Sequence, residues 1–271
     1  MHYDHELAVA RDAARQAGQL IMRAYAELVA VPDAPDWIST PTDHDAQELI
    51  LSVLRNAFPD DALCAEENTP TLATARRQGQ RVWVVDPIDG TRGFARKLGE
   101  FSVMIGFIDA GRVQVGVVLE PAINRLTYAR RGGGCWYVQD GSAPIPCRTN
   151  RTDKPQLATL VQSHAKSGQP TPVVRAVHPA RVLQTYSSGI KLAMVARGEA
   201  DVYVNDYRAF KDWDVCAGCI LVEEAGGVVS DMAGQPIRYQ QADCTQRHGL
   251  LATATPELHA ATLALIARAG I

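Results

Sequence analysis

The sequence lacks a surplus of positive charge and any long apolar run. Its 271 residues include 27 Lys and Arg against 30 Asp and Glu, a formal net charge of -3. This balance provides no broad positive field for a polyanion, so nucleic acid is not an expected partner. No segment approaches the roughly 20 apolar residues that span a bilayer. The first residues also lack the apolar region of a signal peptide. We therefore expect a cytoplasmic protein with no membrane partner.

The sequence also lacks a disulfide framework, because its six cysteines are scattered along the chain. Without an export signal, buried thiols are expected rather than disulfides. Cys216 and Cys219 have the C-x-x-C spacing of a redox or zinc motif. However, the chain has no second such pair and no preceding strand of the thioredoxin kind. Both cysteines lie among small residues in a predicted helix, so a packing role is favoured.

Hydrophobic residues make up 46% of the chain, enough for a substantial core in one large domain or two closely packed ones. Between Leu7 and Leu28 the apolar residues recur at steps of three and four, which predicts a long first helix. A proline-rich break follows. Thr42 as N-cap and Asp45 as its reciprocal partner then predict a second helix that ends near Asn56.

The first strand is predicted at residues 82–85, after these two helices. It should end before Asp86 and Pro87, because proline cannot continue a central ladder. Turn signals separate the next four apolar segments, which together predict an antiparallel meander at residues 101–108, 113–120, 125–130 and 134–139.

The pattern changes after Asn150, where shorter strands alternate with predicted helices. These helices are expected at 187–198, 213–225 and 256–269. We therefore predict mixed layers of sheet and helix. The chain should divide into an N-terminal lobe over 1–150 and a C-terminal lobe over 151–271.

Residues 86–91, with the sequence D-P-I-D-G-T, directly follow a predicted buried strand. Two carboxylates three positions apart across a tight turn can point at one cation, and Mg²⁺ prefers oxygen ligands in octahedral geometry. The carbonyl of Ile88 is a candidate additional ligand. Gly90 allows a phosphate to approach the backbone, where the amides of Gly90 and Thr91 can donate to it. An ordinary acidic turn is the weaker interpretation.

Two other acidic segments are less specific on their own. Glu66 and Glu67 lie in a predicted loop, where adjacent acids are usually solvated. Asp214 begins a predicted helix, where a carboxylate complements the helix dipole. From the residues alone, these simple roles are favoured.

Together, three segments resemble the inositol monophosphatase family of lithium-sensitive, magnesium-dependent phosphatases: AEE at 65–67, WVVDPIDGT at 83–91 and WDVCAGCILVEEAGG at 213–227. The resemblance covers nearly the whole chain in the expected order. It implies an α+β fold, the layered αβαβα sandwich of the inositol monophosphatase and fructose-1,6-bisphosphatase type, and a homodimer. It also implies two or three Mg²⁺ ions, with ligands at Glu66, Asp86, the Ile88 carbonyl, Asp89 and Asp214.

The resemblance further implies hydrolysis of a small phosphorylated substrate by metal-activated water, without a covalent intermediate. Glu66 and Thr91 would position the attacking water, with Asp43 orienting it. Asp43 has a simpler alternative role as a charge at a helix N-terminus. The ion that stabilises the leaving oxygen would be held by Asp86, Asp89 and Asp214.

The residues after the metal-binding motif most resemble the 3'(2'),5'-bisphosphate nucleotidase branch. The similar segments are GTRGFARKLGEFSV, Ser163-His164 and YSSGIKLAMVARGEADVYV. That branch usually has glycine-serine-serine where this chain has Ser187-Ser188-Gly189. The resemblance implies substrate contacts at Asp89, Gly90, Thr91, Arg92, Ser188, Lys191 and Asp214. Arg92 and Lys191 could instead be solvated cations.

Other functions remain open at this stage. Within the family, the substrate could be inositol 1-phosphate, histidinol phosphate or fructose 1,6-bisphosphate. Haloacid-dehalogenase phosphatases also place an aspartate before D-G-T and use it as nucleophile, but with D-x-D-G-T spacing near the chain start. A phosphometabolite sensor without activity would be expected to have lost a ligand, yet every implied carboxylate is present.

Overall fold

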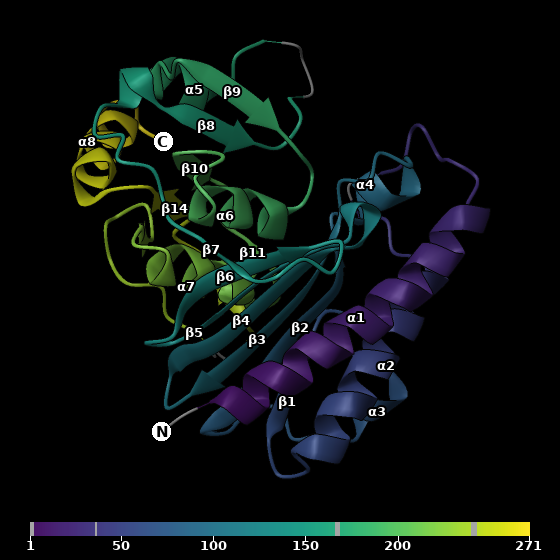
Figure 1. Ribbon diagram of the computed structural model, residues 1–271. Coiled ribbons are helices and arrows are strands. Elements are labelled where there is room, and N and C mark those ends of the chain that lie inside the picture. Colours follow the sequence, from purple (N-terminus) through teal and green to yellow (C-terminus); the bar gives the residue numbers. More distant parts are fainter. Residues whose placement is uncertain (1–2, 36, 166–168, 240–242) are drawn as a thin grey trace.

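The structure, a computed structural model, describes residues 3–35, 37–165, 169–239 and 243–271. Two large sheets alternate with pairs of helices in five layers (Figure 1). The order is α1 with α2, a seven-stranded sheet, α6 with α7, a five-stranded sheet, and α5 with α8. The predicted layered αβαβα sandwich is therefore confirmed. Within the described residues, no helix combines the length and apolarity that crossing a membrane requires.

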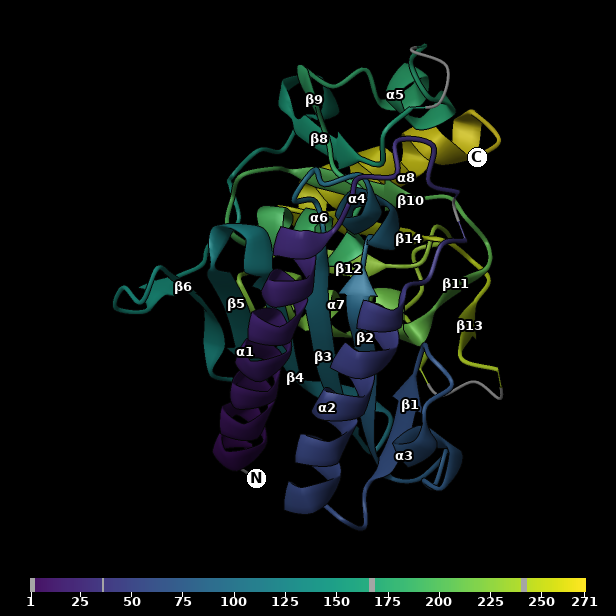
Figure 2. The same ribbon diagram turned by 90° about the vertical axis from the view of Figure 1, so that its right-hand side faces the viewer.

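The helices α1 (Asp4–Glu27) and α2 (Pro41–Ala57) lie side by side on the outer face of the seven-stranded sheet (Figure 2). The predicted apolar stripe of α1 is confirmed, since Ala10, Ala14, Ala17 and Ile21 are fully buried in this layer. These two helices bury the aromatic core of the sheet, including Trp83.

The predicted start of α2 is wrong by two residues. Thr40, rather than Thr42, is the N-cap, and Asp43, rather than Asp45, accepts from the backbone N–H of Thr40 at 2.9 Å. Pro41 explains the difference, because proline is favoured at the first helical position, where its missing N–H removes no hydrogen bond. The shift brings Asp43 into the first turn of the helix.

The seven-stranded sheet follows chain order, and only β1 and β2 are parallel. The meander prediction is confirmed for the antiparallel strands that follow β2. The strand at β1 was not predicted, since only two helices were expected before the first strand. The strands are β1 (Ala62–Ala65), β2 (Arg81–Asp89), β3 (Ser102–Asp109), β4 (Arg112–Glu120), β5 (Arg125–Arg130), β6 (Gly134–Gln139) and β7 (Ile145–Pro146).

β2 continues through Pro87, so the prediction that it ends before Asp86 is wrong. The ladder with β3 accommodates the proline by a register shift: Asp86 pairs with Met104 and Asp89 with Ser102. Such irregularities re-aim side chains and are the places where a strand tolerates proline. This irregularity places both carboxylates at the end of the strand.

The second sheet has the strand order β12-β14-β10-β8-β9, and β11 pairs with β13 beside it. The change of sheet falls between Pro146 and Thr159. The strands are β8 (Thr159–Gln162), β9 (Arg181–Gln184), β10 (Val202–Asn205), β11 (Phe210–Lys211), β12 (Val228–Ser230), β13 (Thr245–Gln246) and β14 (Leu250–Thr253).

The three predicted C-terminal helices are confirmed with small shifts of their ends, as α6 (Ser188–Ala196), α7 (Cys216–Glu224) and α8 (Pro256–Arg268). Three short helices complete the described chain: α3 (Pro70–Ala73), α4 (Thr91–Ala95) and α5 (Pro172–Val177). Short 3-10 turns occur at Pro121–Ile123, Pro155–Leu157 and Asp212–Asp214.

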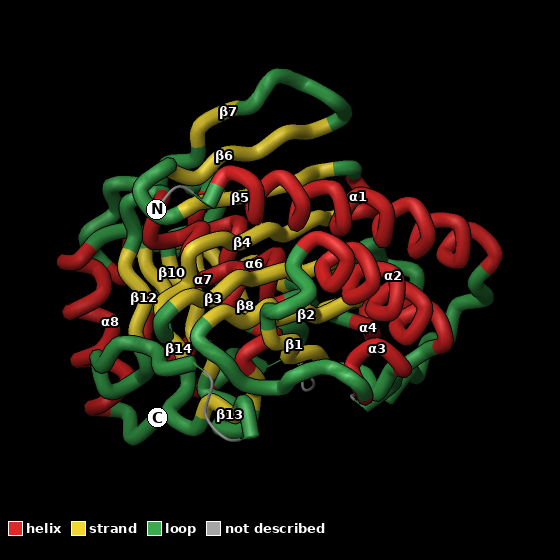
Figure 3. The backbone as a smooth tube through the Cα atoms, turned by 90° about the horizontal axis from the view of Figure 1, so that it is seen from below, coloured by secondary structure: helices red, strands yellow, loops and turns green. Residues whose placement is uncertain are grey.

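The layer of α6 and α7 lies between the two sheets (Figure 3), and two glycines allow α7 to approach closely. Gly106 and Gly116 are cross-strand partners on β3 and β4. A Cβ at Gly116 would lie 2.3 Å from the Ala217 carbonyl oxygen, and one at Gly106 would lie 2.5 Å from the Cys216 sulfur. The close contact fixes the start of α7, which lies two residues after Asp214.

Cys216 and Cys219 are free thiols buried in this layer. Burial raises the pKa of both, that of Cys219 to about 12. Such thiols stay protonated and pack as small apolar groups. Elsewhere, Cys64 at the end of β1 and Cys244 before β13 place their sulfurs 3.1 Å apart.

Candidate active site

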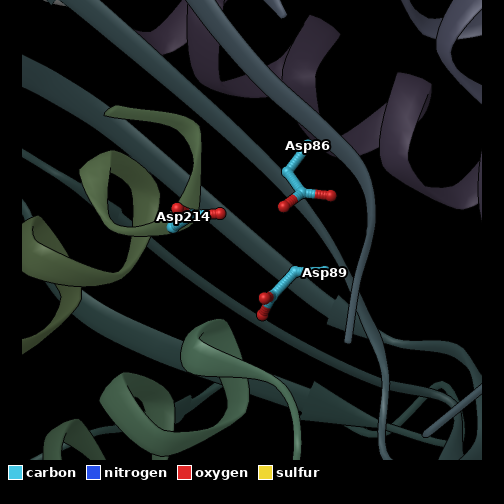
Figure 4. Close-up of side chains that lie close together, drawn as sticks. All are labelled: Asp86, Asp89 and Asp214. Atoms are coloured by element: carbon cyan, nitrogen blue, oxygen red, sulfur yellow. The ribbon is translucent and has the colours of Figure 1, made fainter. Parts of the chain in front are cut away.

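Three carboxylates from two distant segments converge where β2 ends and α7 begins (Figure 4). Asp86 and Asp89 come from the irregular end of β2, and Asp214 from the turn before α7. One oxygen from each lies within 4.8 Å of the others. This span is close to the separation of about 4.2 Å between opposite ligands of an octahedral Mg²⁺. The structure thus brings together Asp89 and Asp214, which lie 125 positions apart along the chain.

Asp89 is held rigidly by the N-terminus of α6. Its Oδ2 accepts from the Gly189 amide at 2.7 Å and from the Ser187 hydroxyl. Its Oδ1 accepts from the Ser188 hydroxyl at 3.1 Å. The donors orient the carboxylate and stabilise its charged form, as outer hydrogen bonds do for metal ligands.

Asp86 has the opposite environment. It is 2% exposed, and its Oδ1 is buried without a hydrogen-bond partner among the residues described. Loss of hydration, followed by repulsion from Glu66, Asp89 and Asp214, raises its pKa well above the usual range. A buried carboxylate oxygen without a donor is costly unless a cation balances it. The site therefore fits a hard divalent cation, for which carboxylate oxygens are the preferred ligands.

Glu66 lies beside this group, immediately after β1. Its carboxyl is within hydrogen-bonding reach of Asp86, and loss of hydration followed by the charges of Asp214 and Glu67 raises its pKa to about 8. The Glu66 side chain is nevertheless exposed at the surface, so loss of hydration is limited there. We therefore attribute its raised pKa mainly to repulsion from the neighbouring carboxylates.

Asp214 is only partly buried, and loss of hydration with repulsion from Asp89 raises its pKa to about 7, although the Lys211 amide opposes the shift. That amide donates to Asp214 Oδ2 at 2.6 Å. We call Glu66, Asp86, Asp89 and Asp214 the acidic cage. Its carboxyl groups repel one another when no cation is present, which is typical of a metal site.

Thr91 and Asp43 meet across the chain beside the cage. The Thr91 hydroxyl lies 3.0 Å from Asp43 Oδ1 and 2.9 Å from the Ile88 carbonyl oxygen. The other oxygen of Asp43 accepts from Thr40 and holds the start of α2. Asp43 therefore serves as a helix-capping residue and contacts Thr91 as well. The hydroxyl has one proton and can donate to only one of its two neighbours, so its lone pairs are free to accept from water.

Gly90 owes its identity to packing and backbone conformation. Its φ is +86°, and a Cβ there would lie 2.7 Å from the Glu100 carbonyl oxygen and 3.1 Å from the Ser187 nitrogen. Only glycine adopts this conformation without strain. The space left by the missing side chain faces protein, so close approach of a phosphate is not what the glycine itself provides.

The remaining predicted contacts have partners within the protein. Ser188 donates to Asp89 and lies 2.6 Å from the Asp214 carbonyl oxygen, so it positions ligands of the acidic cage. Lys191 is 1% exposed and donates to the Tyr186 carbonyl at 2.8 Å. Burial lowers the pKa of Lys191 to about 8, against the attraction of Asp89. The Arg92 guanidinium lies 5.5 Å from the centre of the Tyr186 ring.

Sequence reasoning missed the polar residues that support the site. Ser102 contacts the Ser187 hydroxyl at 2.9 Å, and Ser187 in turn contacts Asp89. Glu100 accepts from the Tyr186 amide at 3.2 Å. Serine before a helix is an N-cap signal that could have identified Ser187. No local pattern marks Ser102 or Glu100, because their partners are about 85 positions away.

Comparison with known proteins relates this arrangement to phosphatases. A sequence model described as the inositol monophosphatase family matches residues 2–270. The 3'(2'),5'-bisphosphate nucleotidase CysQ of Escherichia coli K12 is 33% identical over 232 residues, covering 83% of this chain and 90% of that protein. The fructose-1,6-bisphosphatase/inositol-1-monophosphatase of Thermotoga maritima is 31% identical over 228 residues, covering 82% of each chain. Inositol monophosphatase 2 of Mus musculus is 31% identical over 87% of this chain and 82% of its own.

Solved structures agree on the fold. The Thermotoga maritima IMPase superposes with a TM-score of 0.80 at 24% identity, covering 99% of this chain and 98% of that one. The inositol monophosphatase from Anabaena superposes with a TM-score of 0.79 at 25% identity, covering 99% and 97%. Because each superposition covers 99% of this chain, the shared fold includes both sheets and all five layers.

Proposed function

Because the chain belongs to the inositol monophosphatase family, whose members are metal-dependent phosphatases, we propose that it uses Mg²⁺ and removes the 3'-phosphate from a nucleoside 3',5'-bisphosphate. The convergence of Asp86, Asp89 and Asp214 within 4.8 Å is the observation on which this rests. The cage supplies oxygen ligands, and the buried Oδ1 of Asp86 needs a cation.

We propose that Glu66, Asp86, the Ile88 carbonyl, Asp89 and Asp214 hold the metal, which supplies positive charge to the phosphate and makes water a better nucleophile. Two or three ions are expected by the resemblance. The protein contributes fixed oxygen ligands, because Asp89 is oriented by the N-terminus of α6.

The contact between Thr91 and Asp43 supports a joint role for the two residues. Thr91 can accept a hydrogen bond from the attacking water while it donates to Asp43, so the pair would orient that water. Glu66, which is exposed at the edge of the cage, would take the proton that the water loses. The amides of Gly90 and Thr91 would donate to the phosphate oxygens.

A nucleotide substrate is supported by the relatives named CysQ, which are 32–33% identical to this chain. The motif residue Arg92 lies beside Thr91 and so next to the proposed phosphate position. Inositol 1-phosphate is the second candidate, because the inositol monophosphatase relatives are 31% identical. By the same resemblance we propose a homodimer and inhibition by lithium, which light scattering and a lithium titration would test.

A substrate panel tests this proposal. Phosphate release is measured with and without Mg²⁺ from adenosine 3',5'-bisphosphate, inositol 1-phosphate, histidinol phosphate and fructose 1,6-bisphosphate. The nucleotide should give the highest kcat/KM, and chelation of the metal should abolish release from every substrate. A higher kcat/KM for inositol 1-phosphate would replace the nucleotidase assignment with that of an inositol monophosphatase. Equal release in the presence of a chelator would contradict the role of the metal.

A further inference from the structure

Cys64 and Cys244 form a pair of thiols that the proposed reaction does not use. Their sulfurs lie 3.1 Å apart, although 180 positions separate the two residues in the chain. All six cysteines belong to the described residues, and only Cys244 is partly exposed. A small oxidant can therefore reach one thiol of the pair, and the second is close enough to react with the first. A disulfide needs the sulfurs at about 2.05 Å, so they would approach by about 1 Å.

The backbone around Cys244 holds this thiol in a defined position. Cys244 has a φ of +52°, in the left-handed region that favours glycine and asparagine. Its carbonyl accepts from the Asp212 amide at 2.9 Å. The next residue, Thr245, pairs with Lys211 in the ladder of β11 and β13. A strained residue persists only where its surroundings determine it, and such residues gather at functional sites. The fold therefore sets the contact between Cys244 and Cys64.

The surroundings also favour reaction at Cys244 before Cys64. The hydrogen bond with Cys64 lowers the pKa of Cys244, although burial and the charge of Asp212 oppose the shift. The positive charges of Arg77 and Lys211 act in the same direction as the hydrogen bond. The thiolate is the form of cysteine that reacts with oxidants. Cys64 is only 4% exposed, so it meets an oxidised Cys244 rather than the oxidant itself.

The two thiols lie on segments that carry two members of the acidic cage. Glu66 follows Cys64 by two positions, immediately after β1. The amide that donates to the Cys244 carbonyl belongs to Asp212, which begins the 3-10 turn that contains Asp214. At this point β1 lies beside the pair β11 and β13 (Figure 2). A bond between the sulfurs would therefore draw the two segments together, in a site whose oxygen ligands must keep the octahedral spacing of Mg²⁺.

We propose that Cys64 and Cys244 form a reversible disulfide that weakens metal binding in the acidic cage and so inhibits the enzyme under oxidising conditions. Hydrogen peroxide is the oxidant. The Cys244 sulfur attacks its O–O bond, takes up one oxygen as a sulfenic acid and releases one water. The Cys64 sulfur then attacks the Cys244 sulfur, which breaks the S–O bond, forms the S–S bond and releases a second water. Two electrons pass from the thiols to the peroxide, the two thiol protons leave in the waters, and a dithiol reverses the change by exchange.

Treatment of the full chain with hydrogen peroxide, and then with dithiothreitol, tests the proposal. The test variant is Cys244→Ser. The matched control is Cys147→Ser, which removes a buried thiol that contacts Cys135 instead. Alkylation of the denatured chain counts the free thiols, and peptide mass spectrometry identifies the linked pair. Calorimetric titration with Mg²⁺ measures metal binding without any substrate, and the melting temperature of each variant establishes that it is folded.

After peroxide, the wild type should have two fewer free thiols than its six cysteines provide, with residues 64 and 244 linked. Its dissociation constant for Mg²⁺ should rise roughly 10- to 100-fold, the usual effect of disturbing the surroundings of metal ligands. Phosphate release at limiting Mg²⁺ should fall with it, and dithiothreitol should restore both. Cys244→Ser should keep its Mg²⁺ affinity after peroxide, whereas Cys147→Ser should behave as the wild type does.

Three results would overturn the proposal: a wild type that keeps all six thiols in peroxide, a linked pair with unchanged Mg²⁺ affinity, or a Cys244→Ser variant that loses as much affinity as the wild type. The effect on activity rests on the proposed phosphatase function, whereas the disulfide and its effect on metal binding do not. A chain that releases no phosphate from any substrate of the panel, yet binds Mg²⁺ more weakly once Cys64 and Cys244 are linked, would contradict the phosphatase assignment and support the disulfide.

Discussion

Asp86 and Asp89 lie three positions apart but have different surroundings. Asp89 accepts three hydrogen bonds from the N-terminus of α6. Asp86 has a buried Oδ1 without a donor among the residues described. An amide at Asp89 would place an NH2 group against donors, which would disturb the fold locally. Asp86 is therefore the cleaner position at which to test the metal site.

We predict that Asp86→Asn lowers Mg²⁺-dependent phosphate release at least about a hundredfold, since even the loss of an outer hydrogen bond at a metal site costs about 10- to 100-fold. Steady-state kinetics measure the loss. In EDTA the variant should melt at a higher temperature than the wild type, because one member of a repulsive cluster loses its charge. Retained activity would mean that Asp86 is not a metal ligand.

Thr91→Val should lower kcat about a hundredfold, because the hydroxyl that meets Asp43 at 3.0 Å is lost while the side-chain shape is kept. KM should change only slightly, since the effect concerns orientation of water. Thr91→Ser is the matched control and should recover most of kcat. A Thr91→Val enzyme with normal kcat would assign the hydroxyl a purely structural role at the Ile88 carbonyl.

At the scale of elements, strands bounded by clear turn signals were predictable from the sequence. The bounds of β5 and β6 agree with the prediction because Pro and Gly-Gly-Gly turns border them. β1 was missed because Ala62–Ala65 is short, uniformly buried and shows no alternation. β2 was predicted too short. Proline is excluded from a regular strand ladder, but the register shift between Asp86 and Asp89 lets β2 continue through Pro87.

The contact between α7 and the sheet also belongs to this scale. Gly116→Ala should lower the free energy of unfolding by about 1–3 kcal/mol, the cost of overpacking, because its Cβ would lie 2.3 Å from the Ala217 carbonyl oxygen. Urea unfolding measures the change. Activity should fall as well, since α7 begins only two residues after Asp214.

Gly79→Ala is the matched control for this substitution. Its Cβ would meet other atoms at 3.5 Å or more, which is ordinary contact, and its φ is not positive. Its stability should change by less than about 1 kcal/mol. Equal unfolding midpoints for both variants would show that α7 does not rest on the glycine pair.

For the whole molecule, the sequence pattern predicted layered sheets and helices but did not show which distant residues meet. The motif at 86–91 identified two carboxylates by local spacing alone. Glu66 and Asp214 have simple local interpretations, and only the family resemblance placed them in the site. Tyr186 and Glu100 lie in two separate segments of the chain, and the contact between them brings together residues 86 positions apart. Such convergence is a property of the tertiary fold.

The electrostatics of the site should link stability to pH and metal. The pKa of Asp214 is raised to about 7 and that of Glu66 to about 8, so the metal-free folded state holds protons that the unfolded chain releases. The resulting stability is fully present below about pH 4, where the unfolded carboxyls are also protonated, and is lost as the pH rises through the folded pKa values of about 7 and 8. In EDTA, the melting temperature should therefore fall between about pH 4 and pH 8 and then level off.

Mg²⁺ should remove most of this fall, because the cation replaces the protons and stabilises the ionised cage. The gain in melting temperature from Mg²⁺ should thus be larger at about pH 9 than at about pH 6. Thermal unfolding in EDTA and in Mg²⁺ at each of these two pH values measures the gain. A gain in melting temperature that is larger at the lower pH would contradict the raised pKa values of Asp214 and Glu66.

The central claim is that four carboxylates, from segments distant in the chain, bind a divalent cation together. The most direct measurement is anomalous diffraction from crystals grown with Mn²⁺, a substitute for Mg²⁺ with the same preference for oxygen ligands. We predict an anomalous peak between Asp86, Asp89 and Asp214, with Glu66 at its edge. A peak bound elsewhere, or an acidic cage without metal at a saturating concentration of Mn²⁺, would contradict the account.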